Sequence, residues 1–339
     1  MKILVTGGAG YIGSHTCLAL IEEGYEVVVV DNLSNSSIEP INRLETLTHQ
    51  KIIFYEVDLR KKIELINIFK ENSIDAVIHF AGLKSVYQSV LQPIEYYNNN
   101  VSSTIVLCDV MKQFNCKTLV FSSSATVYGD PHIVPIKENF PLSATNPYGR
   151  SKLMIEEILR DVFISDDSWQ IARLRYFNPV GAHKTGLIGE DPIGTPSNLF
   201  PYMLQVASGK RKKLSIFGGD YDTHDGTGVR DYIHILDLVE GHIKALKALF
   251  KKKQMLTINL GTGKGYSVLD VISAFEKVSG KKIAYEIIER RDGDIANCYA
   301  DPSLAAESID WKAAYELDEM CEDSWRWQLK NPEGYIKSN

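Results

Sequence analysis

The sequence predicts an α/β protein, with a doubly wound parallel sheet followed by a smaller α+β region. Three observations support this prediction. Over the first 180 residues, short β-branched runs alternate with longer segments of helical apolar spacing, which is the pattern of parallel strands covered by helices on both faces. A glycine-rich turn follows directly after the first of these runs. From Pro179 to Gly228 the chain becomes rich in Gly, Pro and Asn, and a stretch of this length is more often a binding segment than a linker.

The elements of the N-terminal part follow from local patterns. Runs of β-branched residues predict strands, and longer apolar-periodic segments free of interior Pro and Gly predict helices between them. The expected strands are Lys2–Thr6, Glu26–Asp31, Lys51–Val57, Ala76–Phe80, Thr118–Ser122 and Gln170–Arg175. The expected helices are Ile12–Glu23, Lys61–Glu71, Pro93–Phe114 and Tyr148–Val162. In such a sheet the ligand crevice lies beyond the carboxyl ends of the strands.

The C-terminal part contains fewer clear elements. Ordered pieces are expected at Leu199–Val206 and Leu214–Phe217, a strand at Leu256–Leu260, and helices at Ile235–Phe250, Val268–Val278 and Glu316–Leu329. The strand Leu256–Leu260 resembles one that returns to the large sheet, so the order of segments need not follow the order of domains.

The composition is that of an ordinary globular protein. The chain has 339 residues, of which 44% are hydrophobic and 24% charged, which excludes general disorder and allows one large or two medium domains. The 37 basic and 43 acidic residues give a formal net charge of −6, which argues against a general nucleic-acid or membrane-surface binder. Any anionic ligand must therefore be bound by a local basic cluster.

Cysteine and histidine usage excludes several classes of site. The five cysteines are widely spread and form no C-x-x-C pair, so they predict neither a disulfide framework nor a zinc site. The histidines form no H-E-x-x-H arrangement, so we expect no metal centre, and His79 is expected to be a packed core residue. The apolar run at the N-terminus ends after three residues, far short of a signal-peptide core. We therefore expect a cytoplasmic protein.

The glycine-rich turn predicts a dinucleotide site. Gly8, Gly10 and Gly13 form G-x-G-x-x-G between the first strand and the first helix. Glycines there allow a tight turn and close backbone approach, so that a pyrophosphate can bind the N–H groups at the helix N-terminus, as in a Rossmann fold. The second strand ends at Asp31, where a carboxylate can accept hydrogen bonds from the adenosine ribose hydroxyls. Because that carboxylate would repel a 2′-phosphate, NAD is favoured over NADP.

A second group of residues predicts acid–base chemistry. Tyr148 and Lys152 are four residues apart and share one helix face, and Ser122–Ser124 end an earlier strand. Lowering a phenol pKa from about 10 to about 7 requires roughly 4 kcal/mol of phenolate stabilisation. A cation at about 5 Å supplies roughly 3 kcal/mol at an effective dielectric constant of about 20. Lys152 and an oxidised nicotinamide ring together would therefore suffice.

Five segments of the chain resemble one enzyme family. They are Val5–His15, His79–Lys84, Phe121–Gly129, Arg175–Ala182 and Gly226–His234. Together they are similar to the UDP-glucose 4-epimerases, which are extended short-chain dehydrogenases/reductases, and the resemblance covers nearly the whole chain. It implies reversible C4 epimerisation of UDP-glucose and UDP-galactose by an isomerase with a tightly held NAD.

The resemblance also implies roles for residues near the cofactor and the reacting sugar. Tyr148 would take the proton of the sugar 4-hydroxyl with help from Ser124, a transient 4-keto sugar would turn over in the pocket, and Lys152 would also bind the nicotinamide ribose. A site of this kind grips UDP firmly and the sugar loosely. The implied cofactor-binding residues are Gly7, Gly10, Tyr11, Ile12, Gly13, Asp31, Asn32, Asp58, Leu59, Phe80, Ala81, Lys84, Asn99, Ser122, Tyr148, Lys152 and Tyr176.

For the substrate, the resemblance implies a separate set of residues. Arg230 and Arg291 would bind the diphosphate, which suits planar guanidinium groups, and Asp294 the uridine ribose. The full implied set is Ser124, Phe177, Asn178, Asn198, Leu199, Phe217, Arg230, Arg291, Asp294 and Cys298.

Cys298 departs from the pattern of family members restricted to glucose and galactose, which carry a bulky Tyr there. A smaller side chain leaves room for an N-acetyl group on C2, so we expect that UDP-GlcNAc and UDP-GalNAc are also accepted. Tyr299, the next residue, could shift inward and fill that space.

Two alternatives remain open at this point. A nucleotide-sugar dehydratase or decarboxylase on the same scaffold would need an acidic residue near Ala125 and Thr126, and Ala125 has no proton to give. A dinucleotide sensor without catalysis would commonly lack the Tyr or the Lys of the pair, and both are present.

The expected domains are a NAD-binding domain at residues 1–180 and a UDP-sugar-binding domain at 181–339, with a segment near 235–262 returning to the first. The resemblance further suggests a homodimer that forms through the helices Pro93–Phe114 and Tyr148–Val162. No nucleic-acid or membrane partner is expected.

Overall fold

The computed structural model describes residues 1–131, 133–291 and 293–335, and the chain divides into two compact units. Unit 1 comprises Met1–Asp130, Pro141–Tyr176 and Val239–Ile258. Unit 2 comprises Pro131–Phe140, Phe177–Leu238 and Asn259–Asn339. The segment 131–140 thus groups with unit 2, although it precedes that unit's longer segments in the sequence.

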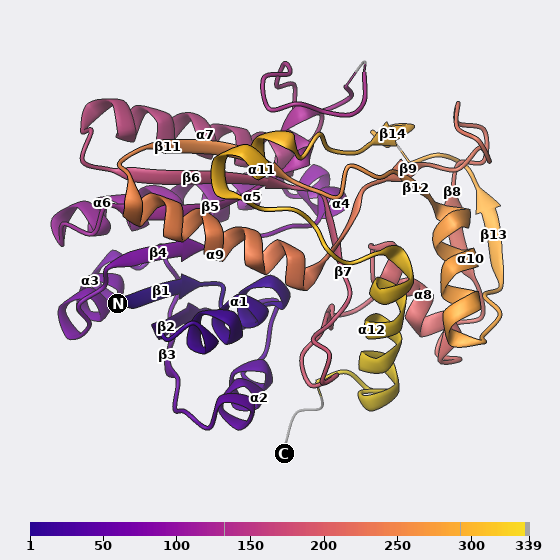
Figure 1. The fold of residues 1–339 in the computed structure, drawn as a ribbon, viewed down its shortest axis with the longest axis horizontal. Coiled ribbons are helices and arrows are strands. Elements are labelled where there is room, and N and C mark those ends of the chain that lie inside the picture. The colour runs from indigo at the N-terminus through magenta and orange to yellow at the C-terminus, as the bar shows by residue number, and fades with distance from the viewer. Residues whose placement is uncertain (132, 292, 336–339) are drawn as a thin grey trace. The chain divides into compact units, whose positions relative to one another are not determined.

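Unit 1 is built on a seven-stranded sheet with the order β11-β6-β5-β4-β1-β2-β3 (Figure 1). The pairings among β1–β6 are all parallel. The strands are β1 (Lys2–Thr6), β2 (Glu26–Asp31), β3 (Ile53–Glu56), β4 (Ala76–His79), β5 (Thr118–Ser124), β6 (Gln170–Tyr176) and β11 (Met255–Leu260). The chain leaves β1 toward β2 on one side and later continues from β4 on the other side, so the strand order reverses between β1 and β4. The predicted doubly wound sheet is confirmed, and β11 joins its edge beside β6.

The helices of unit 1 follow the crossovers between these strands. They are α1 (Tyr11–Glu22), α2 (Glu39–Thr48), α3 (Lys62–Glu71), α4 (Val86–Leu91), α5 (Pro93–Tyr96), the π-helical η1 (Tyr97–Ser102), α6 (Ser103–Gln113), the 3₁₀ turn η2 (Ala125–Tyr128), α7 (Pro147–Ser165) and α9 (Ile235–Lys251). Figure 1 shows α1 and α9 on the side of the sheet that faces the viewer, and an ion pair between Glu23 and Lys247 (2.7 Å) joins them at the surface.

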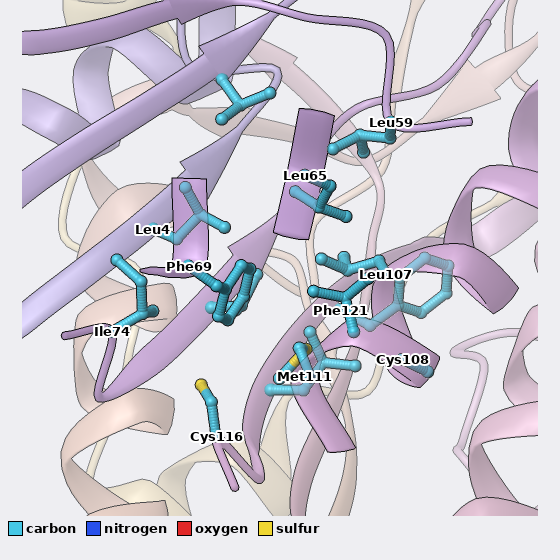
Figure 2. Packing of buried hydrophobic residues seen from close by; sticks show 14 of the residues in the cluster. Leu4, Leu59, Leu65, Phe69, Ile74, Leu107, Cys108, Met111, Cys116 and Phe121 are labelled. Atoms are coloured by element: carbon cyan, nitrogen blue, oxygen red, sulfur yellow. The ribbon is translucent and has the colours of Figure 1, made fainter. Parts of the chain in front are cut away.

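The apolar core of unit 1 fills the space between the sheet and α3, α6 and α7. Figure 2 shows Leu4, Phe121, Leu65, Phe69 and Leu107 within this cluster, drawn from two strands and two helices. Ile155 and Leu159 of α7 belong to the same cluster. Packing on one face of α7 therefore fixes that helix against the sheet.

Several predicted boundaries in unit 1 are wrong by one to three residues, and one predicted helix is divided. The expected helix Pro93–Phe114 is interrupted by the π-helical η1, and the expected strand Thr118–Ser122 extends to Ser124. The helices α2 and α4 were not predicted, because polar residues and the prolines at 40 and 93 break the apolar periodicity around them.

Unit 2 consists of small sheets and four helices. Its strands pair as β10 (Tyr232–His234) with β7 (Asn178–Val180), β13 (Tyr285–Ile288) with β8 (Leu214–Phe217), and β12 (Tyr266–Ser267) and β14 (Asn297–Cys298) with β9 (Val229–Arg230). Its helices are α8 (Leu199–Ala207), α10 (Val268–Ser279), α11 (Ser303–Ile309) and α12 (Leu317–Lys330). An apolar cluster that includes Met203, Ile216, Phe275 and Met320 joins α8, β8, α10 and α12. This mixture of short strands and helices confirms the predicted α+β region.

Helix boundaries in both units follow recognised capping chemistry. Asn146 accepts a hydrogen bond from the Gly149 amide (2.9 Å) at the start of α7, and Pro147 occupies the first helical position. The helix α10 begins with a capping box between Ser267 and Asp270 and ends at Gly280, whose φ is +65°. Across the described part of the chain, no helix combines the length and apolar character that a bilayer crossing requires.

Candidate active site

The turn between β1 and α1 requires glycine at particular positions. Gly7 has a φ of +68°, and a Cβ there would lie 2.7 Å from the amide nitrogen of Ala81. A Cβ on Gly13 would lie 2.2 Å from the carbonyl oxygen of Gly7. Gly10 is the N-cap of α1 and offers no capping side chain to the first turn, which contains Tyr11 and Ile12. The turn therefore fits the pyrophosphate of a dinucleotide, which would bind the amides of this helix N-terminus.

Asp31 lies beside this turn at the end of β2. Its carboxylate accepts hydrogen bonds from the amides of Ala9 (3.1 Å) and Leu33 (2.9 Å) and from the Ser36 hydroxyl (2.9 Å). Burial raises the pKa of Asp31, and these donors oppose that rise. The carboxylate is thus fixed next to the glycine turn, where the sequence analysis expects the adenosine ribose.

Asp58 lies two residues beyond the end of β3, the strand that pairs with β2. The Nδ2 atom of Asn32 lies 3.5 Å from Asp58, and Arg60 forms an ion pair with Asp58 at 2.6 Å. The Arg60 guanidinium lowers the pKa of Asp58 to about 2, so the carboxylate stays ionised. Its neighbour Leu59 is buried in the core.

The residues at the carboxyl end of β4 lie at the same edge of the sheet as those after β2 and β3. His79 is fully buried between the hydroxyls of Thr6 (2.7 Å) and Thr104 (2.9 Å), and burial lowers its pKa to about 3. It is therefore a neutral core residue, as predicted. Phe80 and Ala81 follow it, with the Phe80 ring 4.9 Å from the His242 ring, and Lys84 is exposed on the next loop.

The π-helical segment η1 carries Asn99, which is partly buried, and Asn100, which the sequence analysis missed. The Asn100 side chain accepts a hydrogen bond from the Leu83 amide (2.8 Å) and donates to the Leu83 carbonyl (3.0 Å) and to the Ser151 hydroxyl (3.1 Å). It therefore ties the loop after β4 to α7. Three consecutive asparagines, which are poor helix formers, were the signal for an irregular segment inside an otherwise helical pattern.

Tyr148, Lys152 and Ser124 are brought together by α7 and the end of β5. Tyr148 and Lys152 lie one turn apart on α7, both buried, and the Lys152 Nζ atom is 5.9 Å from the centroid of the Tyr148 ring. Tyr148 forms a hydrogen bond with the side chain of Ser124. Ser124 also accepts hydrogen bonds from the amide (3.2 Å) and the hydroxyl (3.0 Å) of Thr126, so its hydroxyl is fixed.

Burial dominates the electrostatics of this group. It raises the pKa of Tyr148 to about 12, while the hydrogen bond from Ser124 acts in the opposite direction. Burial also lowers the pKa of Lys152 to about 8. A phenolate at Tyr148 therefore needs positive charge nearby, and Lys152 provides one such charge at neutral pH.

Ser122 and Tyr176 extend the site along the neighbouring strands. Their hydroxyl oxygens lie 2.5 Å apart, and the backbone carbonyl of Ser122 accepts a 2.8 Å hydrogen bond from Lys152. The pKa of the Tyr176 phenol is raised by burial and by the nearby Tyr148. Tyr176 is thus a neutral hydrogen-bonding group.

Unit 2 contains a cluster of two arginines, one carboxylate and one aromatic ring. The Arg291 guanidinium lies over the Phe217 ring at 3.6 Å, and Arg230 lies 3.8 Å from Asp294. Burial lowers the pKa of Arg291, and the nearby charge of Arg230 acts in the same direction. The charge of Arg230 is near enough to act on Arg291, and two guanidinium groups in one cluster suit an anionic ligand of the kind that the sequence analysis expects here.

Cys298 lies beside this cluster, since β14 pairs with β9 and places Cys298 next to Arg230. The side chain of Cys298 is partly buried, and burial raises its pKa to about 11. The following residue, Tyr299, packs against Gly265, where a Cβ would lie 2.9 Å from the tyrosine ring.

The remaining predicted substrate residues lie on other elements of unit 2. Asn198 is the exposed N-cap of α8 and donates to Glu190 at 3.4 Å, while Leu199 begins that helix and packs on the apolar cluster. Asn178 begins β7 and is exposed, and Phe177 is buried.

One group of possible metal ligands exists in the described part of the chain. His224, Asp225 and Asp270 hold their ligand atoms within 4.8 Å of one another. Asp270 accepts from the Ser267 amide in the capping box of α10, and Asp225 accepts from the Thr227 amide (2.8 Å). These carboxylates therefore have structural roles.

Comparisons with known proteins agree with this geometry. A family model described as "NAD dependent epimerase/dehydratase family" matches residues 3–261. The chain is 58% identical to a UDP-glucose 4-epimerase of Bacillus subtilis over 99% of both chains, and 57% identical to one of Dictyostelium discoideum over 99% and 98%. It is similar, with a TM-score of 0.96 and 53% identity over 98% of this chain and 100% of the other, to a crystal structure of UDP-glucose 4-epimerase from Bifidobacterium longum in complex with NAD+ and UDP.

Proposed function

The chain belongs to the NAD dependent epimerase/dehydratase family, and from this premise we propose that it catalyses the reversible C4 epimerisation of UDP-glucose and UDP-galactose. The observation that carries this proposal is the buried group of Tyr148, Lys152 and Ser124, which joins a phenol, a cation and a fixed hydroxyl at the end of β5. General acid–base catalysis requires a positioned acid or base within reach of the proton that is transferred, and the Tyr148 phenol would serve as that group.

Unit 1 would bind NAD. The glycine turn and Asp31 suit the pyrophosphate and the adenosine ribose, and Asp58, Phe80 and Lys84 lie at the ends of the neighbouring strands. NAD held there would supply reversible hydride chemistry at the sugar C4 and would be regenerated in each turnover. A carboxylate at Asp31, next to the ribose position, would repel a 2′-phosphate, and NAD is therefore favoured over NADP.

Tyr148 would accept the proton of the sugar 4-hydroxyl and return it after the sugar has turned over. The hydrogen bond from Ser124 and the charge of Lys152 both favour the phenolate form. C4 would be inverted when the hydride is returned to the opposite face of the 4-keto carbon and Tyr148 returns the proton to the 4-oxygen. The chain's own contribution would therefore be to accept one proton at the Tyr148 oxygen and to hold it there while the 4-keto sugar turns over.

Unit 2 would bind the UDP part of the substrate. Arg230 and Arg291 would bind the diphosphate, Asp294 the uridine ribose, and Phe217, Asn178, Asn198 and Leu199 the remaining nucleotide and sugar surface. The short distance between the Arg291 guanidinium and the Phe217 ring supports this, since stacking on the ring fixes the direction of the charged group. We accordingly propose that unit 1 corresponds to a NAD-binding domain and unit 2 to a UDP-sugar-binding domain.

The related dehydratases and decarboxylases are a less suitable assignment. Their reactions need a further acid or base directly after β5, and Ala125 occupies that place with a methyl group. The hydroxyl of Thr126 already donates to Ser124.

Acceptance of N-acetylated UDP-sugars is a further part of the proposal. Cys298 is a small side chain beside Arg230, and the Tyr299 ring packs against Gly265, so Tyr299 does not replace the missing bulk at position 298 in this conformation.

A homodimer in the cytoplasm is the proposed assembly and location. Apolar side chains are exposed along α4, α5, α6 and α7, including Tyr87, Leu91, Ile94, Ile105 and Met154. Exposed apolar side chains on neighbouring helices favour association, here of two copies of the chain. The five cysteines are free thiols, which fits a reducing compartment.

The test of the main proposal is incubation of the purified chain with UDP-galactose without added cofactor, followed by NMR of the nucleotide sugars. Appearance of UDP-glucose would establish C4 inversion with a resident NAD. No conversion, even after NAD is supplied, would contradict the proposal, and a 4-keto-6-deoxy sugar as product would favour the dehydratase.

A further inference from the structure

A buried ion pair joins α7, one turn after Lys152, to the neighbouring strand β6. Glu156 of α7 and Arg175 of β6 are both almost fully buried and bind each other through two parallel contacts, Nη2 to Oε2 at 2.6 Å and Nε to Oε1 at 2.9 Å. Arg175 also donates to the Tyr128 hydroxyl at 2.9 Å and lies over the Tyr128 ring. Neither charged group contacts the predicted substrate or cofactor residues through these bonds.

The stability of the fold does not by itself explain this pair. A buried ion pair costs desolvation energy and is often replaced by apolar residues without loss of stability, and its best-attested benefit is to fix the registry of the elements that carry it. The question is therefore which elements Glu156 and Arg175 hold in register.

The contacts of Glu156 place it in a series that joins β5 to α7. The Ser122 carbonyl accepts from Lys152 (2.8 Å), the Ser123 hydroxyl donates to Glu156 (2.6 Å), and the Ser124 side chain bonds Tyr148. Three successive residues of β5 thus contact three residues of α7 that lie one turn apart from each other. A shift or rotation of α7 would break all three contacts together.

We propose that Glu156 is a positioning residue for the epimerisation: it fixes α7 against the end of β5 through Ser123 and keeps a negative charge one helical turn from Lys152. This inference rests on the proposed function, because the residues it positions are those assigned to that reaction. Arg175 supports the role by balancing the charge of Glu156 and holding its carboxylate in one orientation.

The charges around Lys152 agree with this role. On α7, Glu156 raises the pKa of Lys152 against the larger effect of burial. From β4, His79 faces Lys152 as a neutral ring, and from β6, Tyr176 is a protonated phenol near Tyr148. From α5, Tyr96 acts on Tyr148, and Arg175 on β6 is the cation that opposes Glu156. Among these groups, Glu156 is the negative charge that acts on the pKa of Lys152.

Replacement of the Glu156 carboxylate by a neutral amide tests whether its charge acts on Lys152. In Glu156→Gln the pKa of Lys152 should fall by about one unit, and the alkaline limb of the kcat–pH profile should move down by the same amount. The titration of Lys152 is read by NMR of ¹³C-labelled lysine, with Lys152→Met for assignment, and needs no turnover. Glu157→Gln is the matched control, since Glu157 is exposed on the same helix, and it should leave both readouts unchanged.

Replacement of Ser123 tests whether its bond to Glu156 positions α7, and it leaves no buried charge unpaired. Ser123→Ala removes the 2.6 Å bond to Glu156 but keeps the ion pair with Arg175, so the variant should fold even where Glu156→Gln does not. Misplacement of α7 should lower kcat about ten- to a hundredfold, while KM for UDP-galactose and the content of bound NAD stay within about twofold.

The inference is overturned if both variants lower only the melting temperature and leave kcat and the titration of Lys152 as in the wild type. It is also overturned if Ser123→Ala raises KM and leaves kcat unchanged. Failure of the proposed function gives a different result: the wild type and Glu157→Gln would then convert no UDP-galactose, while the NMR titration of Lys152 would still respond to Glu156→Gln.

Discussion

The ammonium group of Lys152 donates a 2.8 Å hydrogen bond to the backbone carbonyl of Ser122, and this bond holds the cation 5.9 Å from the centre of the Tyr148 ring. The cation is therefore fixed by the sheet rather than by a carboxylate partner in direct contact. A carboxylate in that place would neutralise the charge that the phenolate of Tyr148 needs.

Removal of the Lys152 charge should change both the rate and its pH dependence. In Lys152→Met, turnover at pH 7 should fall about a hundredfold, because about 3 kcal/mol of phenolate stabilisation is lost. The residual activity should rise steadily between about pH 7 and pH 10 as more phenolate forms. Wild-type turnover should instead decline above about pH 8, since the pKa of Lys152 is lowered to about 8 and the cation is lost there. A profile of kcat against pH for both proteins decides this, and parallel profiles would contradict it.

Tyr148→Phe should separate catalysis from cofactor binding. Loss of the phenol oxygen removes the proton acceptor, so kcat should fall about 10²- to 10⁴-fold, while bound NAD, measured after denaturation of the purified protein, stays at the wild-type level. Tyr55→Phe is the control, since the Tyr55 hydroxyl bonds Glu71 at the surface of unit 1. Undiminished turnover in Tyr148→Phe would remove Tyr148 from the mechanism.

Arg291→Met should weaken UDP binding without loss of NAD. The substitution removes a charge-assisted contact to the diphosphate but keeps an apolar side chain against Phe217, so the inhibition constant of UDP should rise about ten- to a hundredfold. Arg290→Met is a matched control, because Arg290 is the neighbouring residue and pairs with Asp220 at the surface. If both variants raised the inhibition constant of UDP equally, the general positive charge of this loop would explain the effect. A specific contact of Arg291 with the diphosphate would then be contradicted.

Cys298→Tyr should restrict the substrate range. A bulky ring beside Arg230 would fill the space assigned to an N-acetyl group, so turnover of UDP-GlcNAc should fall at least about tenfold while turnover of UDP-galactose changes little. Cys298→Ser keeps the size and should retain both activities. Unchanged conversion of UDP-GlcNAc by the tyrosine variant would refute the proposed role of Cys298.

A charge on the apolar surface of α5 should prevent the proposed dimer. Ile94 is 82% exposed, and Ile94→Glu would place a carboxylate in the contact between two copies, so sedimentation should show a monomer at concentrations where the wild type is dimeric. Ile63→Glu, at an equally exposed site on α3, should leave the wild-type state unchanged. A monomeric wild type would contradict the proposed assembly itself.

The features that could be predicted from the sequence depend on residues that are close together along the chain. The glycines at 7, 10 and 13, the acidic end of β2 and the four-residue spacing of Tyr148 and Lys152 act over a few residues of chain, and the strand and helix periods translate them directly into geometry. The doubly wound sheet was predictable for the same reason, since alternating strand and helix patterns admit few connections.

Contacts between distant segments were decided only by the tertiary structure. The side chain of Asn100 binds Ser151 and Leu83, and its π-helical segment replaced the uniform helix that the local pattern predicted. The stacking of Arg291 on Phe217 joins the loop after β13 to β8 in unit 2. The bonds of Glu156 to Ser123 and Arg175 join three elements of unit 1. A sequence states which side chains are available and how neighbours along the chain face one another, but burial and long-range packing select the partners that determine their charge and orientation.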